Sequence, residues 1–223
     1  MTTSVPRFNL GSGSIKFIDG FPFEGLGSAG FEETDLLIRG DDLDNLDLIG
    51  GDGHDEIEGE AGNDKFLGGN GNDTLEGDDG NDDLDGQEGT DKLFGGNGDD
   101  ILRAGGNNPV VIQDGVRLQG DFDRLTGGDG NDTFAFYGYG HFEVTDFNIL
   151  GQKDSLFQDR IGFDSQILGI SSFEELEPSI TNYYYDPANF GAGFTVEFDY
   201  GAATIEFTNV DINLITMDMV VFL

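Results

Sequence analysis

The chain has 223 residues, of which 36% are hydrophobic and none is Cys, so disulfides and thiol chemistry are excluded. It has 10 Lys and Arg against 45 Asp and Glu, and the resulting formal charge of −35 would repel phosphate backbones and anionic lipid head groups. Nucleic acid is therefore excluded as a partner. We also expect no transmembrane segment, because the sequence contains no run of about eighteen apolar residues.

Residues 1–29 combine Gly, Ser and Pro with several Phe. This composition predicts an irregular or capping segment at the start of the chain. The segment contains no basic stretch followed by an apolar run, so we expect no Sec-type signal peptide.

A nine-residue pattern begins faintly at residue 30. The unit GFEETDLLI (30–38) has Asp35 and Leu37 at its sixth and eighth places but lacks a second Gly. The next stretch, RGDDLDNLDLI (39–49), is longer than one unit and puts Leu46 where an Asp is expected. We therefore predict a degenerate opening turn, followed by a turn whose sequence argues against a cation site.

The pattern becomes regular between residues 50 and 103. Six uninterrupted units read GGDGHDEIE, GEAGNDKFL, GGNGNDTLE, GDDGNDDLD, GQEGTDKLF and GGNGDDILR. Each has Gly at its first and fourth places, Asp at its sixth and an apolar residue at its eighth. The sixth-place residues are Asp55, Asp64, Asp73, Asp82, Asp91 and Asp100, and the eighth-place residues are Ile57, Phe66, Leu75, Leu84, Leu93 and Leu102. A fixed short period is a stronger guide to the fold than local propensity.

Each of these recurring residues has a physical reason. Gly permits backbone angles that are closed to residues with a Cβ, so the G-x-x-G-x-D turn can curl tightly and aim its carbonyl oxygens inward. The Asp adds a carboxylate, and the next three residues can form a short strand with one side chain pointing to the interior. A cage of carboxylate and carbonyl oxygens favours Ca²⁺, since Zn²⁺ prefers nitrogen and sulfur ligands and Mg²⁺ tends to retain water.

The repeat is interrupted at residues 104–119. Two apolar triplets there flank Gln113-Asp114-Gly115, which predicts a hairpin inserted into the repeat region. The pattern returns in residues 120–126 and in the complete unit GGDGNDTFA (127–135). The restored sixth-place residues are Asp123 and Asp132.

The repeated pattern G-G-x-G-x-D-x-U-x resembles the RTX, or hemolysin-type, calcium-binding nonapeptide. The resemblance implies a parallel β-roll with two nonapeptides per turn and each ion clamped between turns that are two repeats apart. It implies the carboxylate pairs Asp55 with Asp73, Asp64 with Asp82, Asp73 with Asp91, and Asp82 with Asp100. The metal-site residues it implies are Asp55, Asp64, Asp73, Asp82, Asp91, Asp100, Asp123 and Asp132, together with Gly51, Gly53, Gly62, Gly69, Gly71, Gly80, Gly89, Gly96, Gly98, Gly128 and Gly130.

From residue 136 to residue 223 aromatic and β-branched residues replace Gly. Residues 142–147, 180–185, 194–200 and 203–208 alternate as strands do. SSFEEL (171–176) predicts a short helix with a capping box. The segment is similar to the C-terminal part of serralysin-type secreted proteins, on the evidence of the stretches DFN (146–148), DRIGFDSQILGISSFEEL (159–176) and TIEFTNVDINLITMDMVVF (204–222). Its end, DMVVFL, resembles the uncleaved export signal of type I secretion.

We expect no catalytic residues. The two histidines, His54 and His141, lie outside any H-E-x-x-H motif, which argues against a serralysin-like zinc protease. No G-x-S-x-G nucleophile elbow occurs, which argues against a lipase. His54 stands at the variable fifth place of a turn and is expected to be solvated.

The fold predicted from these observations is all-β. A parallel β-roll of calcium-binding nonapeptide repeats should cover residues 30–135, and a mostly antiparallel β cap with one short helix should cover residues 136–223. We expect a secreted bacterial protein that binds several Ca²⁺ ions and whose folding is driven by extracellular calcium, because the crowded carboxylates resist compaction without cations. We expect it to be exported by a type I secretion apparatus and to be non-catalytic.

Two alternatives stay open. One is an accessory module that binds or modifies an extracellular polysaccharide, as in alginate epimerases, and the other is a calcium-dependent surface or matrix structural protein. A groove that binds a polyanion would need several basic side chains. Only five basic residues lie between residues 50 and 135, namely Lys65, Lys92, Arg103, Arg117 and Arg124.

Overall fold

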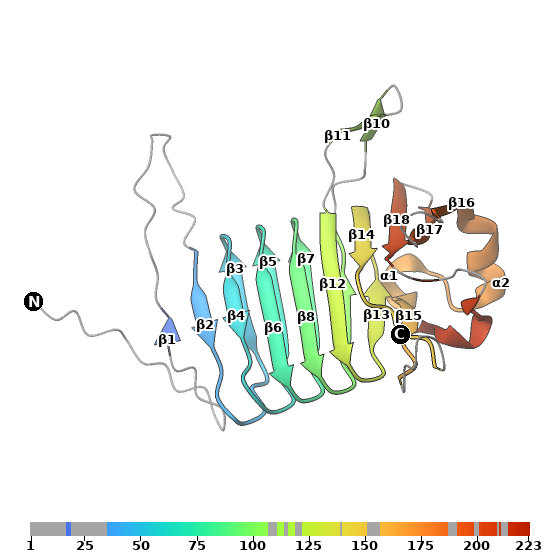
Figure 1. The fold of residues 1–223 in the computed structure, drawn as a ribbon. Helices are drawn as coiled ribbons and strands as arrows, with labels where there is room; N and C mark the ends of the chain where they lie inside the picture. Colours follow the sequence, from blue (N-terminus) through green and yellow to red (C-terminus); the bar gives the residue numbers. More distant parts are fainter. Residues whose placement is uncertain are drawn as a thin grey trace, which may run out of the picture.

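The computed structural model describes residues 17–18, 35–106, 111–113, 116–118, 122–138, 140–150, 157–186, 191–198, 201–208, 210 and 214–223. Over these residues the fold is almost entirely β, and successive repeats alternate between two facing sheets. Figure 1 shows the strands of the roll side by side, with the C-terminal region at one end. This arrangement is the predicted parallel β-roll.

The two long sheets share the strands of the roll. In spatial order, the ten-stranded sheet consists of β1 (Phe17–Ile18), β2 (Leu37–Arg39), β4 (Glu56–Glu58), β6 (Thr74–Asp79), β8 (Lys92–Asn97), β12 (Phe122–Asp129), β14 (Gly140–Val144), β18 (Gly201–Phe207), β17 (Gly191–Phe198) and β16 (Ile180–Asp186). The seven-stranded sheet consists of β19 (Val220–Phe222), β15 (Arg160–Phe163), β13 (Thr133–Phe136), β9 (Ile101–Ala104), β7 (Asp83–Glu88), β5 (Lys65–Asn70) and β3 (Leu48–Asp52).

Neighbouring strands of the roll are parallel and two repeats apart in sequence. Ile57 pairs with Leu75 and Leu75 with Leu93, so each pair is separated by 18 residues. Leu93 pairs with Leu125, a separation of 32 residues, so the roll continues in register across the insertion. Two nonapeptides therefore make one turn, as the resemblance to RTX repeats implied.

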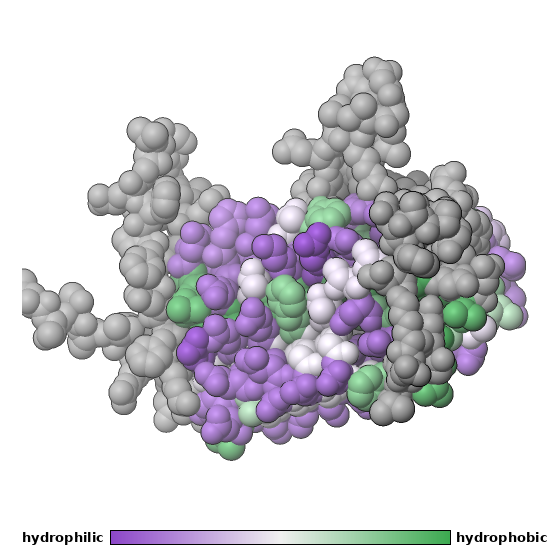
Figure 2. Space-filling model, in the orientation of Figure 1, coloured by the Kyte–Doolittle hydropathy of each residue, from purple (hydrophilic) through white to green (hydrophobic). Residues whose placement is uncertain are grey.

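The eighth-place side chains fill the interior of the roll. They come from both sheets and each is at most 1% exposed; they are Leu48, Ile57, Phe66, Leu75, Leu84, Leu93, Leu102, Leu125 and Phe134. Burying each such side chain contributes about 1.5–3 kcal/mol. In Figure 2 the outer surface over the roll is mostly hydrophilic, in keeping with one inward side chain per strand.

The first turn differs by one residue from the predicted register. Ile38, not Leu37, pairs with Ile57 and is buried. Leu36 consequently stands at the sixth place and Asp35 at the fifth. Three consecutive apolar residues left the inward residue ambiguous in the sequence, and pairing with the next turn decides it, because a slip of one residue would reverse every side chain.

The second turn is also shifted. Asn45, not Leu46, stands at the sixth place and donates its backbone N–H to Asp64 Oδ1 at 2.6 Å. Leu46 is 70% exposed, while Leu48 is buried in the interior. This turn has one residue more than a regular unit between its sixth-place and its inward residue, and the additional residue is accommodated at the surface.

The predicted hairpin is confirmed. β10 (Val111–Gln113) and β11 (Val116–Leu118) pair antiparallel, and Gln113 lies opposite Val116. Only two residues, Asp114 and Gly115, connect the strands, as expected for an Asp-Gly turn. Figure 1 shows the hairpin standing out from the roll.

The C-terminal cap continues both sheets of the roll. β14 pairs parallel with β12, and β18 with β14; in the other sheet β15 pairs parallel with β13, and β19 with β15. The strands β16, β17 and β18 form an antiparallel meander. The antiparallel part of the cap therefore lies beyond a parallel junction with the roll. Aromatic contacts fill its core, from Phe136, Phe142, Phe147, Phe163 and Phe207.

The helices are short. The expected helix is α2 (Phe173–Leu176), which begins after Ser172, and the Glu175 carboxylate accepts the N–H of Ser171 at 2.8 Å. α1 (Ser165–Leu168), η1 (Glu177–Ser179) and η3 (Met217–Met219) are single turns. Among the described residues, no helix is long and apolar enough to cross a bilayer.

The segment that resembles an export signal forms part of the cap. β19 lies within it as an edge strand of the seven-stranded sheet. The backbone N–H of Leu223 donates to the carbonyl of Phe163 at 2.9 Å, and its carbonyl accepts from Ser165 Oγ at 2.6 Å.

Candidate calcium-binding turns

The turns between strands depend on backbone conformations that favour Gly. All eleven glycines predicted in the site have φ between 100° and 156°, namely Gly51, Gly53, Gly62, Gly69, Gly71, Gly80, Gly89, Gly96, Gly98, Gly128 and Gly130. Residues with a Cβ rarely adopt such angles. Three turns nevertheless have another residue at the second place, with φ of 75° at Glu60, 68° at Asp78 and 69° at Gln87.

The sixth-place aspartates form two columns, one along each edge of the roll. In the first, which we call the Asp55 column, Asp55, Asp73, Asp91 and Asp123 occupy successive turns; in the second, the Asp64 column, Asp64, Asp82, Asp100 and Asp132 do so. Within a column, Oδ1 of each Asp accepts the backbone N–H of the preceding one. The bond from Asp55 N to Asp73 Oδ1 measures 2.8 Å and that from Asp64 N to Asp82 Oδ1 measures 2.7 Å.

The second carboxylate oxygen, Oδ2, has no such role. It is buried and accepts no hydrogen bond in Asp55, Asp64, Asp73, Asp82, Asp100 and Asp132, side chains that are at most 2% exposed. A buried carboxylate oxygen without a donor is costly unless a positive charge is beside it. The buried Oδ2 atoms therefore indicate a cation as their partner, which the chain does not itself provide.

The first-place Gly makes room for this oxygen. A Cβ on Gly68 would lie 2.5 Å from Asp73 Oδ2 and 2.7 Å from the carbonyl oxygen of Gly86, which belongs to the next turn of the same column. The same two kinds of oxygen surround Gly50, Gly59, Gly77 and Gly95. A carboxylate oxygen and a carbonyl oxygen from successive turns thus converge at each of these positions.

Burial raises the pKa of the column carboxyls. The pKa is raised to about 6 in Asp73, about 7 in Asp82 and about 8 in Asp100, mainly because burial removes water from the charged form. Carboxylates in neighbouring turns raise it further, while the hydrogen bond from the preceding backbone N–H lowers it. Without a cation, folding therefore shifts these carboxyls toward their protonated form.

The donor set fits Ca²⁺. In the described ranges no three His, Cys, Asp or Glu side chains converge, so a complete shell must include backbone carbonyl oxygens. Ca²⁺ accepts six to eight oxygen ligands, including carboxylates and backbone carbonyls. The chain offers both at the first-place Gly positions. The predicted pairs, such as Asp55 with Asp73, occupy successive turns of one column, and in each pair one Oδ1 is already used by the backbone.

Comparison with protein families agrees with this geometry. Residues 47–75, 76–111 and 119–136 match the RTX calcium-binding nonapeptide repeat, in four copies. Within these matched ranges, the turns of the roll are similar to RTX calcium-binding nonapeptide repeats. A comparison with curated proteins gives no match.

Among solved structures, this chain is similar to the extracellular lipase LipA from Serratia marcescens. The alignment has 16% sequence identity and a TM-score of 0.29, and it covers 87% of this chain and 41% of the lipase chain. This chain therefore spans less than half the length of that protein.

The fifth places of the turns form two further rows of hydrogen bonds, one on each side of the roll, that the sequence analysis missed. His54 is exposed, but its Nδ1 accepts the backbone N–H of Asn72 at 2.8 Å. Asn72 Oδ1 accepts from Thr90 N at 3.0 Å, and Asn63 Oδ1 accepts from Asn81 N at 2.8 Å. The fifth place thus requires a short hydrogen-bond acceptor. The recurrence of Asn, Asp and Thr at this place was the available signal.

Two further aspartates lie where the RTX repeats meet the cap. Asp159 is fully buried; its Oδ1 accepts the N–H of Asp132 at 3.0 Å and its Oδ2 that of Asn148 at 2.6 Å. Asp146 accepts the N–H groups of Gly127 and Gly128 at 2.9 and 2.8 Å. Asp159 continues the Asp64 column beyond the last repeat, where the nonapeptide spacing could not predict it.

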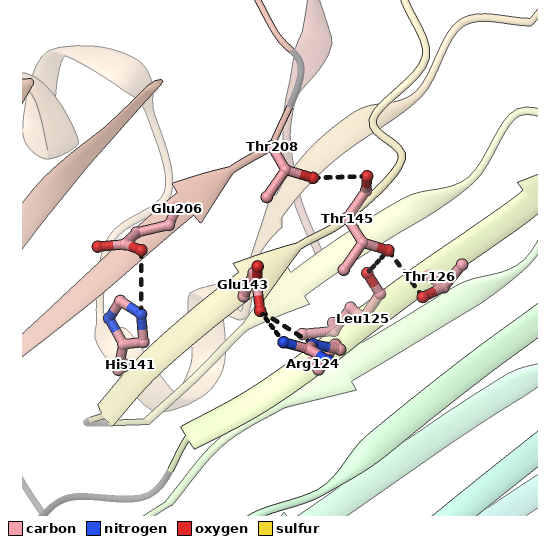
Figure 3. Close-up of polar contacts among 8 residues, drawn as sticks. All are labelled: Arg124, Leu125, Thr126, His141, Glu143, Thr145, Glu206 and Thr208. Atoms are coloured by element: carbon pink, nitrogen blue, oxygen red, sulfur yellow. Dashed lines mark hydrogen bonds and ion pairs between the residues drawn. The ribbon is translucent and has the colours of Figure 1, made fainter. Parts of the chain in front are cut away.

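The two histidines lie in different parts of the chain. His54 belongs to an RTX turn, whereas His141 lies in β14, where its ring stacks on Phe122 with centroids 4.8 Å apart. Figure 3 shows His141 Nε2 facing Glu206, at 3.3 Å. The sequence-based expectation of no zinc protease stays a prediction.

Proposed function

We propose that this protein is a secreted, non-catalytic calcium-binding protein whose roll folds when calcium is supplied outside the cell. RTX repeats imply calcium binding. The observation that supports the coupling to folding is the row of buried Oδ2 atoms that accept no hydrogen bond. A fold that buries these oxygens is incomplete without a positive charge beside them.

The chain prepares the site in three ways. Each sixth-place Asp fixes its orientation by accepting a backbone N–H through Oδ1, as Asp82 does from Asp64. The first-place Gly leaves space for Oδ2, and a carbonyl of the next turn faces the same space. Bound Ca²⁺ would supply the positive charge and the coordination that Oδ2 lacks. Since these groups come together only in the folded roll, binding and folding are one equilibrium.

The location follows from the required calcium concentration. Extracellular calcium modules bind with dissociation constants of about 10⁻⁴ to 10⁻³ M, well above the free calcium inside cells. With a formal charge of −35, the chain would stay extended where calcium is scarce and fold where it is abundant. An extended chain suits passage through a type I secretion channel.

The test is a calcium titration of metal-free protein, followed by far-UV circular dichroism and isothermal titration calorimetry. We expect a cooperative gain of β-structure with Ca²⁺ and little with Mg²⁺, which needs stricter octahedral geometry. Equal β-structure with and without calcium would refute the coupling, and absence of binding heat would refute the calcium function. Detection of the chain in the medium of a host with a type I exporter tests secretion.

Binding of an acidic polysaccharide is less well supported. Arg103 pairs with Asp83 at 2.7 Å, and Arg124 pairs with Glu143 at 2.7 Å (Figure 3). These two guanidinium groups of the roll are therefore already neutralised by carboxylates. Retention of the calcium-loaded protein on an immobilised polyuronate, lost in Lys92→Ala, would favour this alternative.

A further inference from the structure

The second turn of the roll has an amide where the regular turns have a carboxylate. Asn45 is 4% exposed and stands at the sixth place, directly before Asp64 in the Asp64 column. Its carbonyl accepts the N–H of Lys65 at 2.9 Å, just as the carbonyl of Asp55 accepts from Thr74 at 2.8 Å. The backbone of this turn therefore has the geometry of a regular site.

The space beside this side chain is also that of a regular site. A Cβ on Gly40 would lie 2.5 Å from the carbonyl oxygen of Gly59 and 3.1 Å from Asn45 Nδ2. At the next turn, a Cβ on Gly59 would meet the Gly77 carbonyl at 2.7 Å and Asp64 Oδ2 at 2.5 Å. Asn45 Nδ2 thus occupies the place that Oδ2 has elsewhere.

The amide nitrogen is surrounded by oxygens. It donates to the carbonyl of Leu43, to Asp64 Oδ1 at 3.0 Å and, in a longer contact, to the carbonyl of Asp41 at 3.4 Å. All three are acceptors, so they require a donor and fix the orientation of the amide. Two backbone carbonyls and one carboxylate oxygen are also ligands that a hard cation would accept.

We propose that the Asn45 amide takes the place of an ion and closes the row of calcium sites in the Asp64 column at its N-terminal end. This inference rests on the proposed calcium function. The amide protons satisfy oxygens that would otherwise need a cation, so the second turn is complete without calcium. The row then begins at Asp64, and it ends where Asp159 has both oxygens bonded to backbone N–H groups.

The test compares calcium stoichiometry in three variants by calorimetry and by metal analysis after desalting. Asn45→Asp should bind one more Ca²⁺ per chain than the wild type, because it restores Oδ2 beside Gly40. Asn63→Asp adds the same charge at an exposed fifth place and keeps the acceptor for Asn81 N, so its stoichiometry should equal the wild type. Asn45→Ala should also keep the wild-type stoichiometry, although it should need more calcium to fold.

The outcomes separate the two proposals. If the wild type binds no calcium, the proposed function fails. If the wild type binds calcium but Asn45→Asp folds with an unchanged ion count, the inference about Asn45 is overturned. A loss of one ion in Asn45→Ala overturns it as well, because it would mean that the wild-type amide is itself a ligand, through its oxygen. This arm decides the matter even if Asn45→Asp does not fold.

Discussion

Asp82 allows the pH dependence of the metal-free roll to be worked out. Burial raises the pKa of this carboxyl to about 7, against about 4 for an unperturbed Asp. At about 1.4 kcal/mol per pKa unit, the folded state binds this proton more strongly than the unfolded state by about 4 kcal/mol. Because the folded pKa lies above the unfolded one, this stability is fully present below pH 4 and is lost as the pH rises to 7.

Each column carboxyl with a raised pKa acts in the same direction, and Asp100, with a pKa of about 8, extends the window upward. A small domain is stable by only about 5–15 kcal/mol in total, so a few such groups decide whether it folds. We therefore expect the roll of the metal-free protein to be unfolded at pH 8 and to gain β-structure as the pH falls toward 5, without any calcium.

The assay is far-UV circular dichroism of protein freed of metal on a chelating resin, since soluble chelators themselves titrate in this range. Asp82→Asn should show a weaker pH dependence than the wild type. Its matched control is Asn81→Asp, which places a carboxyl at the adjacent exposed position. If the metal-free spectrum is the same at pH 8 and pH 5, buried carboxylates are not what prevents folding, and the reasoning fails.

Three other substitutions test single features. Gln87→Gly should stabilise the calcium-loaded roll by about 0.5–1 kcal/mol in urea unfolding, because it relieves a left-handed backbone at a non-Gly residue. Gly69→Ala, at the equivalent second place of another turn, should destabilise the roll. Equal effects of the two substitutions would contradict the turn geometry. Asp159→Ala should cost about 2–4 kcal/mol through two unpaired N–H groups without changing the ion count. Asp82→Ala should lower calcium affinity in calorimetry more than Asp55→Ala, which stands at the start of its column; indistinguishable affinities would argue against shared ligands.

Much of the roll could be predicted because one chemical requirement recurs at each place. The eighth-place residue must be apolar, since its side chain enters the interior between the two sheets, and Phe66 and Leu75 are indeed fully buried. In the regular units the sixth place is Asp, and the structure brings Asp73 and Asp91 into one column, as the resemblance to RTX repeats implied. The period therefore located the turns and the interior, and the resemblance to RTX repeats located the columns.

The first turns and the junction could not be predicted by the same means. In the second turn, one additional residue moved Asn45 into the sixth place, and only contact with Asp64 reveals the shift. Asp159 joins the Asp64 column from a segment 27 residues beyond Asp132, where no repeat remains. Such residues are placed by tertiary pairing, and a local pattern contains no information about it.

The junction between roll and cap leads to the last prediction. β12 and β13 are covered by β14 and β15 in parallel register, so the last turn of the roll has no free strand edge there. Phe136 packs against Phe142 and Phe163 of the cap, with ring centroids 5.2 and 6.3 Å apart. An end turn without this cover would expose two strand edges and an aromatic core, which favours edge pairing between chains.

Deleting residues 137–223 should therefore abolish the cooperative, calcium-induced folding of the roll. The cap core is apolar and contains few carboxylates, so it can fold without calcium. The folded cap can then template the turn that precedes it, as a capping repeat does in other repeat proteins. The measurement is calcium-induced circular dichroism together with light scattering, which reports association through exposed edges. As the matched control, Leu150→Ser changes a cap side chain that is 61% exposed and should leave folding unchanged. If the isolated roll folds in calcium as sharply as the whole chain and stays monomeric, the roll needs no template, and calcium alone sets its order.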